Sequence, residues 1–209
     1  MYAAAIAAFA REGYEGTSVR TIADDAGVTV SVIYHHYGNK QDLLYSILTA
    51  STKDLARDLD EAVDDGPARP DLLLARLVMT MARYYANRTP EASVLNMEMR
   101  HLSPENLAKH LPLRRRIQAM FDKAIAEGCA AGYFQVENQK VASRVIIVMC
   151  RDIASWFRSD GKWTDQEVAL DYVRMALDVV RTKPASRRRA LAQFTDVVAQ
   201  PSSSSTRMA

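Results

Sequence analysis

The sequence predicts an all-α protein, and three observations support that class. Glycine and proline are scarce, with 8 and 7 in 209 residues. In nearly every segment the apolar residues recur at steps of three and four, which is the period of a helix. Helix starts are well marked, as at Thr89 with Pro90 and at Ser103 with Pro104. The length suits one large domain or a small domain joined to a larger one.

The first forty residues predict a helix followed by two short ones. The first helix is expected to end at Gly13, because glycine favours the backbone turn that closes a helix. Thr17 or Ser18 can cap a short helix through residue 25, and Gly27 breaks it. Thr29 can cap the next short helix, to about residue 37.

A long helix is predicted to begin after Asn39, which has with Asp42 the spacing of a capping box, and to run past Leu59. The composition changes at DDGPARP, residues 64–70, which indicates a connection. The Ser-rich end at 200–209 is expected to be disordered. Further helices are predicted over 71–88, 90–102, 106–132, 141–157 and 164–183.

Composition narrows the class of protein. The 27 Lys+Arg and 25 Asp+Glu give a formal charge of +2, which neither requires nor excludes nucleic acid. Cys129 and Cys150 lie far apart without a CxxC or a His pair nearby, so neither a disulfide framework nor a metal site is expected. No apolar run reaches the roughly 18 residues of a membrane span, and the start lacks a basic signal-peptide region. We therefore expect a soluble, cytoplasmic protein without membrane contact.

Catalytic motifs are not found in the sequence. There is no set of nucleophile, base and orienting group, no HExxH, no Gly-rich phosphate loop and no cluster of carboxylates with histidine. An enzyme is therefore the least favoured class, and no cofactor is expected.

The segment AGVTVSVIYHHYGNK, residues 26–40, has the arrangement of a helix-turn-helix, whose second helix enters the major groove of DNA. Val28, Ile33 and Tyr37 fall on the side that would pack inward. The hydroxyls, imidazoles and small valines left outside suit phosphate oxygens, base edges and thymine methyls. These outward residues are Thr29, Val30, Ser31, Val32, Tyr34, His35 and His36.

Lys40, at the predicted start of the long helix, would direct a cation and free backbone N–H groups toward phosphate. The alternative is that a helix-turn-helix pattern arises by chance in a helical protein, with Tyr34 and His36 merely packed or solvated. The segment is not strongly basic, so non-specific binding to DNA should be modest and sensitive to salt.

The same residues carry a family resemblance. AAIAAFAREGYEGTSVRTIADDAGVTVSVIYHHYGNKQDLL, without a gap over roughly 3–45, resembles the amino-terminal domain of the TetR family of transcriptional regulators. The resemblance implies a recognition helix at 30–36. This sequence departs from the usual family pattern in two ways. Ser31 stands where glycine is common, and the sequence starts inside the first helix without a basic arm. It implies phosphate contacts near Thr17, Ser18, Tyr34, His36 and Lys40.

The resemblance also implies a ligand-sensing and dimerising domain after about residue 55. The predicted organisation is a three-helix DNA-binding domain at 1–46, a helical effector-binding and dimerisation domain at 47–183, and a carboxy-terminal extension at 184–209. The helices at 141–157 and 164–183 each carry an apolar stripe beside a charged one, so they can form a four-helix bundle with a second copy. The predicted dimer interface is Val145, Met149, Ile153, Tyr172, Ala176 and Val180.

Two alternatives stay open for these helices. The stripes can be the core of a monomer with a solvated charged face, or the arginines at 144, 151 and 158 can bind the phosphates of a nucleotide-like ligand.

The central helices are rich in methionine and aromatic residues, which suit an apolar ligand but are also typical of a plain core. Arg100 and His101 are polar groups at the edge of this stretch that can fix a carboxylate or phosphate. The segments MEMRHLSPE, EGCAAGYFQVENQKVAS and ASWFRSDGKWTDQEVALDYVRMAL are similar to a branch of the family associated with lipid and steroid breakdown, which implies an acyl-CoA or fatty-acid-like effector. The predicted effector-binding residues are Met79, Tyr84, Met97, Arg100, His101, Met120, Phe121, Arg151 and Trp156.

The leading hypothesis is a homodimeric repressor that binds a palindromic operator and is released by a hydrophobic small molecule. The alternative within the same class is a DNA-binding activator or constitutive regulator without a small effector.

Overall fold

The computed structural model describes residues 1–64 and 69–194, where all the regular structure is helical. The all-α prediction is therefore confirmed. The disorder predicted at 200–209 and the middle of the connection at 64–70 lie outside the described residues. The helices are α1 (Tyr2–Gly16), α2 (Val19–Ala26), α3 (Val30–Tyr37), α4 (Lys40–Asp64), α5 (Pro70–Asn87), α6 (Thr89–Met97), the short 3₁₀ helix η1 (Met99–His101), α7 (Pro104–Ala130), α8 (Gln139–Trp156), α9 (Asp165–Val179) and α10 (Pro184–Ala192).

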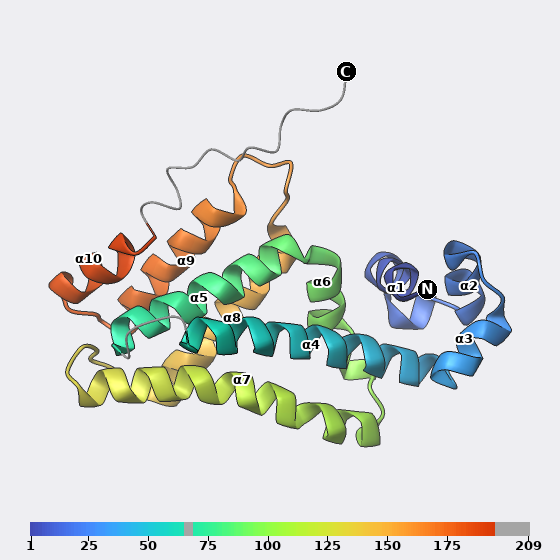
Figure 1. Cartoon of the computed structure of the whole chain (residues 1–209), viewed down its shortest axis with the longest axis horizontal. Coiled ribbons are helices and arrows are strands. Elements are labelled where there is room, and N and C mark those ends of the chain that lie inside the picture. The colour runs from blue at the N-terminus through green and yellow to red at the C-terminus, as the bar shows by residue number, and fades with distance from the viewer. Residues whose placement is uncertain (65–68, 195–209) are drawn as a thin grey trace.

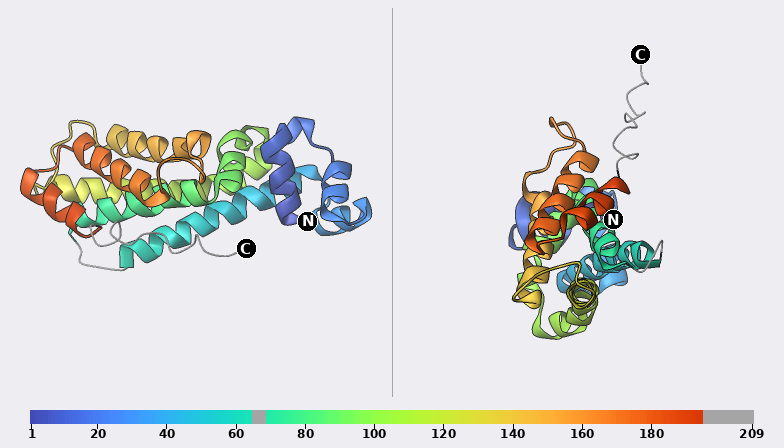
Figure 2. Two further views of the ribbon diagram at one scale, coloured as in Figure 1. Left: turned by 90° about the horizontal axis from the view of Figure 1, so that it is seen from above. Right: turned by 90° about the vertical axis from the view of Figure 1, so that its left-hand side faces the viewer.

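The described chain is elongated, with α1, α2 and α3 at one end and a larger helical bundle at the other (Figure 1; Figure 2). Helix α4 begins beside α3 and continues into the bundle, so it belongs to both parts. It crosses the predicted domain boundary at 46/47 without a break. The predicted domain limits stay predictions.

Helix α1 changes direction at Gly13, where the sequence predicts an end. Gly13 has φ 73° and ψ 168°, a backbone conformation that residues with a side chain avoid. The Thr17 hydroxyl donates to the carbonyl oxygens of Gly13 at 2.7 Å and Ala8 at 3.2 Å. The backbone N–H of Tyr14 donates to the carboxylate of Glu98 at 3.1 Å. These polar groups at the kink are thus paired although they are buried.

Local caps set the short helices that follow. The Ser18 hydroxyl accepts a hydrogen bond from the N–H of Thr21 at 3.0 Å, so Ser18 rather than Thr17 caps α2. Gly27 ends α2 in the left-handed conformation, with φ 64° and ψ 32°. The Asn39 side chain accepts from the N–H of Asp42 at 2.9 Å, which confirms the predicted cap of α4.

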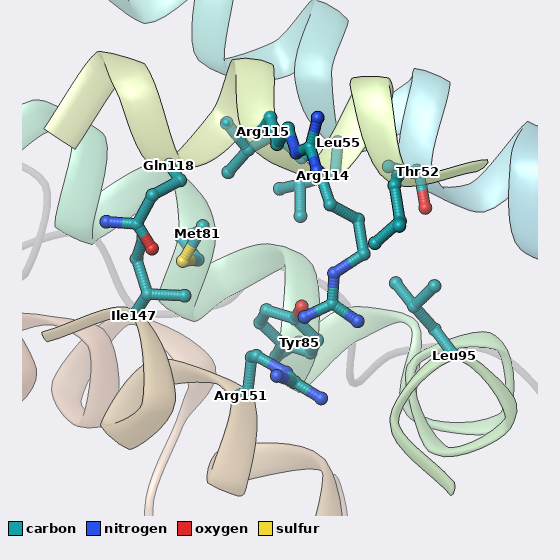
Figure 3. A pocket seen from close by; sticks show the side chains of 12 residues that line it. Thr52, Leu55, Met81, Tyr85, Leu95, Arg114, Arg115, Gln118, Ile147 and Arg151 are labelled. Carbon is teal, nitrogen blue, oxygen red and sulfur yellow. The ribbon is translucent and has the colours of Figure 1, made fainter. Parts of the chain in front are cut away.

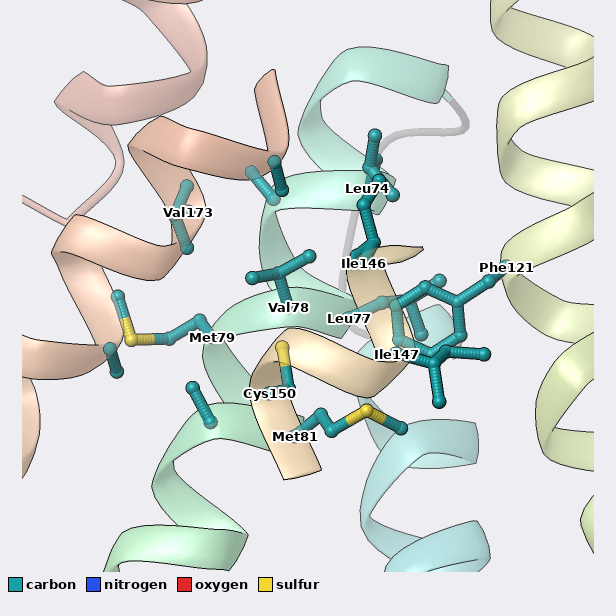
Figure 4. Close-up of a cluster of buried hydrophobic side chains, with 14 of the residues drawn as sticks. Leu74, Leu77, Val78, Met79, Met81, Phe121, Ile146, Ile147, Cys150 and Val173 are labelled. Atoms are coloured by element: carbon teal, nitrogen blue, oxygen red, sulfur yellow. The ribbon is translucent and has the colours of Figure 1, made fainter. Parts of the chain in front are cut away.

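Two hydrophobic cores hold the chain together. The N-terminal core joins α1, α2, α3 and the first half of α4 to residues of α6, including Val94 and Leu95. The C-terminal core contains the rest of α4, with α5, α7, α8, α9 and α10. Helix α5 lies at its centre, and Leu77, Val78 and the fully buried Phe121 are among its packed residues (Figure 4). Each such side chain stabilises the fold by about 1.5–3 kcal/mol.

Two elements differ from the prediction. The single helix expected over 90–102 is divided into α6 and η1 at Glu98, which is only 5% exposed and accepts the N–H of Tyr14. The carboxy-terminal extension contains the unpredicted helix α10, which is fixed by the buried Ala190 and by an ion pair of 2.7 Å between Arg187 and Asp178.

Candidate functional site

The outer surface of α3 is the first candidate site. Ile33 is 1% exposed and anchors the helix in the N-terminal core. On the other side Val32 is 38% exposed and Tyr34 is 47% exposed. Thr29, Ser31, His35 and His36 are also exposed, at the end of the molecule (Figure 1). Helix α3 therefore presents hydroxyls, imidazoles and a phenol on a rigidly backed surface, as predicted.

Two of the residues predicted to face DNA lie elsewhere. Thr17 is 1% exposed and its hydroxyl is used at the α1 kink, so the predicted phosphate contact of its side chain is wrong. Val30 is half-buried and packs against the N-terminal core, so it is only partly available. Ser18 is exposed beside the start of α2.

Lys40 lies at the N-terminus of α4, next to the outer surface of α3. Its ammonium is 4.1 Å from the centre of the Tyr14 ring, a cation–π contact that holds the side chain in place. The first N–H groups of α4 and this cation together form a place that favours an anion. A DNA phosphate next to α3 would satisfy both groups.

The second candidate site is a cavity of about 220 Å³ among α4, α5, α6, α7 and α8 (Figure 3). Leu55, Met81, Leu95, Ile117 and Ile147 supply an apolar wall. The polar part of the lining consists of Thr52, Tyr85, Arg114, Arg115, Gln118 and Arg151. An apolar wall with a few convergent polar groups is typical of a small-molecule site.

The two guanidiniums extend into this cavity beside Tyr85 (Figure 3). Arg114 donates to the Met99 sulfur at 2.7 Å, and Arg151 donates to the side-chain oxygen of Asn96 at 2.9 Å. Burial and the neighbouring charge of Arg151 lower the pKa of Arg114. Burial raises the pKa of Tyr85 to about 12, although both arginines oppose this rise. The phenol is therefore neutral and can donate a hydrogen bond.

Of the nine residues predicted to bind an effector, Arg151 is the one that lines this cavity. Met79 and Phe121 belong to the C-terminal core, and Met120 packs half-buried against it. Tyr84 is also buried and donates to the backbone oxygen of Ser51 at 2.8 Å. None of these four side chains lines this cavity, although Met79 and Tyr84 line a separate pocket beside α5. Their role in binding an effector stays a prediction.

The other four predicted effector residues lie outside the cavity lining. Met97 is 58% exposed and Trp156 is 39% exposed. Arg100 is exposed, and His101 stacks on the Tyr14 ring with the ring centres 5.4 Å apart. His101 thus connects η1 to α1. Tyr85 belongs to the stretch rich in methionine and aromatic residues that the sequence offers as a ligand wall. Arg114 was not predicted to line a cavity, although it shares a helix face with Ile117 and the buried Phe121.

The third candidate site is an apolar face on α8 and α9, formed by Val141, Val145, Val148, Trp156, Met175 and Val179. Each of these six side chains is between 36% and 58% exposed. The Trp156 indole donates to the Tyr172 hydroxyl at 3.3 Å and joins the two helices. Exposed apolar residues gathered on neighbouring helices indicate an interaction surface.

This face differs in part from the predicted dimer interface. Val145 is on it, and Met149 and Tyr172 are half-buried. Ile153, Ala176 and Val180 are fully buried in the C-terminal core, so their prediction as contact residues is wrong.

A buried histidine lies beside the cavity. His110 is 0% exposed, and its Nε2 is 3.4 Å from the hydroxyl of Thr52, which lines the cavity. Burial, followed by the charge of Arg114, lowers the pKa of His110. The imidazole is therefore neutral in the folded protein at neutral pH.

The lowered pKa of His110 predicts a loss of stability in mild acid. Below the ordinary histidine pKa of about 6.5 the unfolded chain takes up a proton that the folded chain resists, so the free energy of unfolding falls as pH falls. Thermal unfolding at pH 7.5 and pH 5.5 should show this loss. In His110→Gln the difference between the two pH values should shrink; an unchanged difference would assign the acid sensitivity to other groups.

In residues 1–64 and 69–194, no helix has both the length and the apolar character needed to cross a membrane. The same part of the chain has no group of three histidine, cysteine or acidic side chains placed to bind a metal.

A helix-turn-helix with an exposed second helix, joined to a helical bundle with a lined cavity, defines a DNA-binding transcriptional regulator. Residues 2–47 match the family model described as bacterial regulatory proteins, tetR family. Residues 68–180 match the model described as the tetracyclin repressor-like C-terminal domain. The chain belongs to the TetR family of transcriptional regulators.

Individual relatives agree with this assignment. The HTH-type transcriptional repressor KstR2 of Mycobacterium tuberculosis is 26% identical over 175 residues, which are 83% of this chain and 87% of that protein. The crystal structure of a tetR-family regulatory protein from Rhodococcus RHA1 has a TM-score of 0.82 and 31% identity, covering 87% of this chain and 95% of that one. AibR in complex with isovaleryl coenzyme A and operator DNA has a TM-score of 0.74 and 25% identity, covering 83% and 96%. The chain is thus a regulator and not an enzyme.

Proposed function

We propose that this protein is a homodimeric repressor that binds a palindromic operator and is released by a hydrophobic small molecule. The observation that carries the DNA-binding part is the exposed surface of α3, held from behind by the buried Ile33. A helix presented in this way can enter the major groove, while Ser18 and Lys40 beside it can contact phosphates. Because operator DNA is the target, the protein acts in the cytoplasm.

The partner proposed for the apolar face of α8 and α9 is a second copy of this chain. A two-fold interface brings the same patch of both subunits together, so a self-complementary apolar stripe suits it. Charged side chains flank the stripe, such as the ion pair of 2.6 Å between Arg174 and Asp171. The resulting four-helix contact would place two copies of α3 on one operator, in successive major grooves.

The cavity is the proposed effector site. AibR, a structural relative, binds isovaleryl coenzyme A, and KstR2 is described as a ketosteroid transcriptional regulator. We therefore propose an acyl-CoA, fatty-acid-like or steroid-derived effector. Leu95 lines the cavity and also belongs to the N-terminal core. Ligand in the cavity can therefore move α6 and change the spacing of the two α3 helices, provided that it binds the altered state more tightly.

Replacing Tyr34 with alanine tests the DNA-binding role. Because Tyr34 is half-exposed on α3, the variant should keep its helicity and its dimer mass. It should lose operator affinity by about tenfold or more, which corresponds to roughly 1.4 kcal/mol or more. Mobility-shift titration and light scattering measure the two properties. Operator binding at full strength by a folded Tyr34→Ala variant would refute this role for α3.

A further inference from the structure

We propose that the effector is an organic anion whose carboxylate or phosphate lies between Arg114 and Arg151, with its apolar part against Leu55, Met81 and Ile147. The inference rests on the proposed role of the cavity as the effector site, and it adds the charge of the ligand and the residues that bind it.

The first argument is that both guanidiniums lack a compensating charge. Within the described parts of the chain neither Arg114 nor Arg151 forms an ion pair with a carboxylate. The side-chain atoms that accept hydrogen bonds from them are neutral: a thioether sulfur for Arg114 and an amide oxygen for Arg151. Two like charges in an apolar cavity repel each other and lose hydration, so a bound anion would offset both costs.

Two other arginines of the bundle have carboxylate partners. Arg69 pairs with the buried Asp71 at 2.6 Å, and Arg116 pairs with Asp60 at 2.6 Å. Arg116 lies on the same helix as Arg114 but does not line the cavity. Arg114 and Arg151 differ from these two arginines because they line the cavity without a carboxylate partner, beside the exposed Arg115 of the same lining.

The second argument is the chemistry of the site. A guanidinium presents a planar set of donors that matches the two oxygens of a carboxylate or phosphate. Tyr85 lies beside both guanidiniums and adds a neutral hydroxyl that can donate (Figure 3). Apolar side chains make up much of the remaining lining, among them Leu55, Met81 and Ile117. The site thus suits an anionic group attached to a hydrocarbon body.

The volume of the cavity limits the size of the hydrocarbon part of the ligand. Its volume of about 220 Å³ is below the roughly 300–1,000 Å³ of pockets for drug-sized ligands. A short acyl chain with its charged end fits this description.

The third argument is that the side chains of both arginines contact the segment between the cavity and the DNA-binding end. Arg151 binds Asn96 in α6, and Arg114 binds Met99 in η1. Glu98, between these two residues, accepts the N–H of Tyr14 in α1. An anion that draws both guanidiniums toward itself would therefore compete for the contacts that fix α6 and η1. This connects occupancy of the cavity to the position of the DNA-binding helices.

The test uses three probes on the full-length chain: hexanoate, hexyl phosphate and the uncharged hexanamide. Calorimetry should show binding of at least one of the two anions, and hexanamide should bind about tenfold or more weakly than that anion. Binding of hexanoate would assign the site to a carboxylate, and binding of hexyl phosphate alone would assign it to a phosphate. Either result supports the inference.

Arg114→Met and Arg151→Met should each weaken the anion by about tenfold or more, because each removes a charge-assisted contact. Arg116→Met, on the same helix and outside the cavity, is the matched control and should bind the anion as the unmodified protein does. Both cavity variants should unfold at an equal or higher temperature than the unmodified protein, since an uncompensated charge has been removed. The anion should raise the unfolding temperature of the unmodified protein and of Arg116→Met alone.

Three results would overturn the inference: hexanamide binding as tightly as the anions, anion binding unaffected by both cavity variants, or no binding of any probe. Operator binding and dimer mass are measured on the same preparations without ligand. If these persist while the anions fail, the ligand assignment is wrong by itself. If operator binding is absent as well, the proposed function fails with it.

Discussion

Replacing Val148 with glutamate should convert the protein into a monomer that no longer holds its operator. Val148 is 58% exposed and lies within the apolar face of α8 and α9. In a two-fold dimer the change would introduce two carboxylates into one apolar contact, at a cost of several kcal/mol for each buried charge. A monomer presents one α3 helix, so operator affinity should fall by about a hundredfold or more, roughly 2.7 kcal/mol. Light scattering and mobility-shift titration measure the two effects.

Val63→Glu is the matched control for this experiment. Val63 is 37% exposed near the end of α4 and is not among the residues of the apolar face. The same substitution there should leave both the dimer mass and the operator affinity unchanged. A Val148→Glu protein that remains dimeric with full affinity would show that the second copy binds elsewhere.

The DNA-binding end of the molecule could be predicted because local signals determine it. Gly13 and Gly27 adopt positive φ angles, which a glycine accepts at little cost. Ser18 and Asn39 cap the helices that follow them. Each of these interactions joins residues close in sequence, so the pattern shows them. The burial of Thr17 depends on the packing of α1, and the sequence pattern does not contain that information.

The face proposed for the dimer was harder to predict because α8 is apolar on two sides. One side, with Ile146, Cys150 and Ile153, is buried in the C-terminal core. The other side carries Val145 and Val148 and is exposed. Apolar residues chosen by helical spacing alone can come from both sides of α8. The predicted interface did combine the two sides, with Val145 from the exposed one and Ile153 from the buried one. Two apolar sides on one helix indicate that each side packs against something. Only the packing of the helices decides which side lies in the core of the same chain.

The inward position of Arg114 was not predicted for a related reason. Three consecutive arginines in LRRRIQ suggest a solvated surface, yet Arg114 points inward and Arg116 pairs outside with Asp60. The inward position follows from the helix period, because Arg114 precedes the buried Ile117 by three residues. The helix period cannot show that α5 and α8 leave space in front of Arg114. That space depends on contacts between helices distant in sequence.

Replacing Glu98 with alanine should lower both the stability of the fold and the affinity for operator DNA. Glu98 is 5% exposed, accepts the N–H of Tyr14 at 3.1 Å and lies 3.5 Å from the His101 ring. Alanine would leave the buried N–H without this acceptor, which predicts a decrease of about 2–3 kcal/mol in the free energy of unfolding. It would also remove a link between α6 and the kink of α1. Urea denaturation and mobility-shift titration should both register the loss.

Glu98→Gln separates the hydrogen bond from the charge. Its side-chain oxygen can still accept the N–H of Tyr14, while the negative charge beside His101 is gone. If the acceptor holds α1 against α6, glutamine should retain most of the stability and operator affinity that alanine loses. Losses equal to those of alanine would place the effect on the charge instead. Because Glu98 lies between Asn96 and Met99, the partners of the two cavity arginines, the alanine variant should also respond less to a ligand. A ligand can shift the position of α3 only through contacts that differ between the two states.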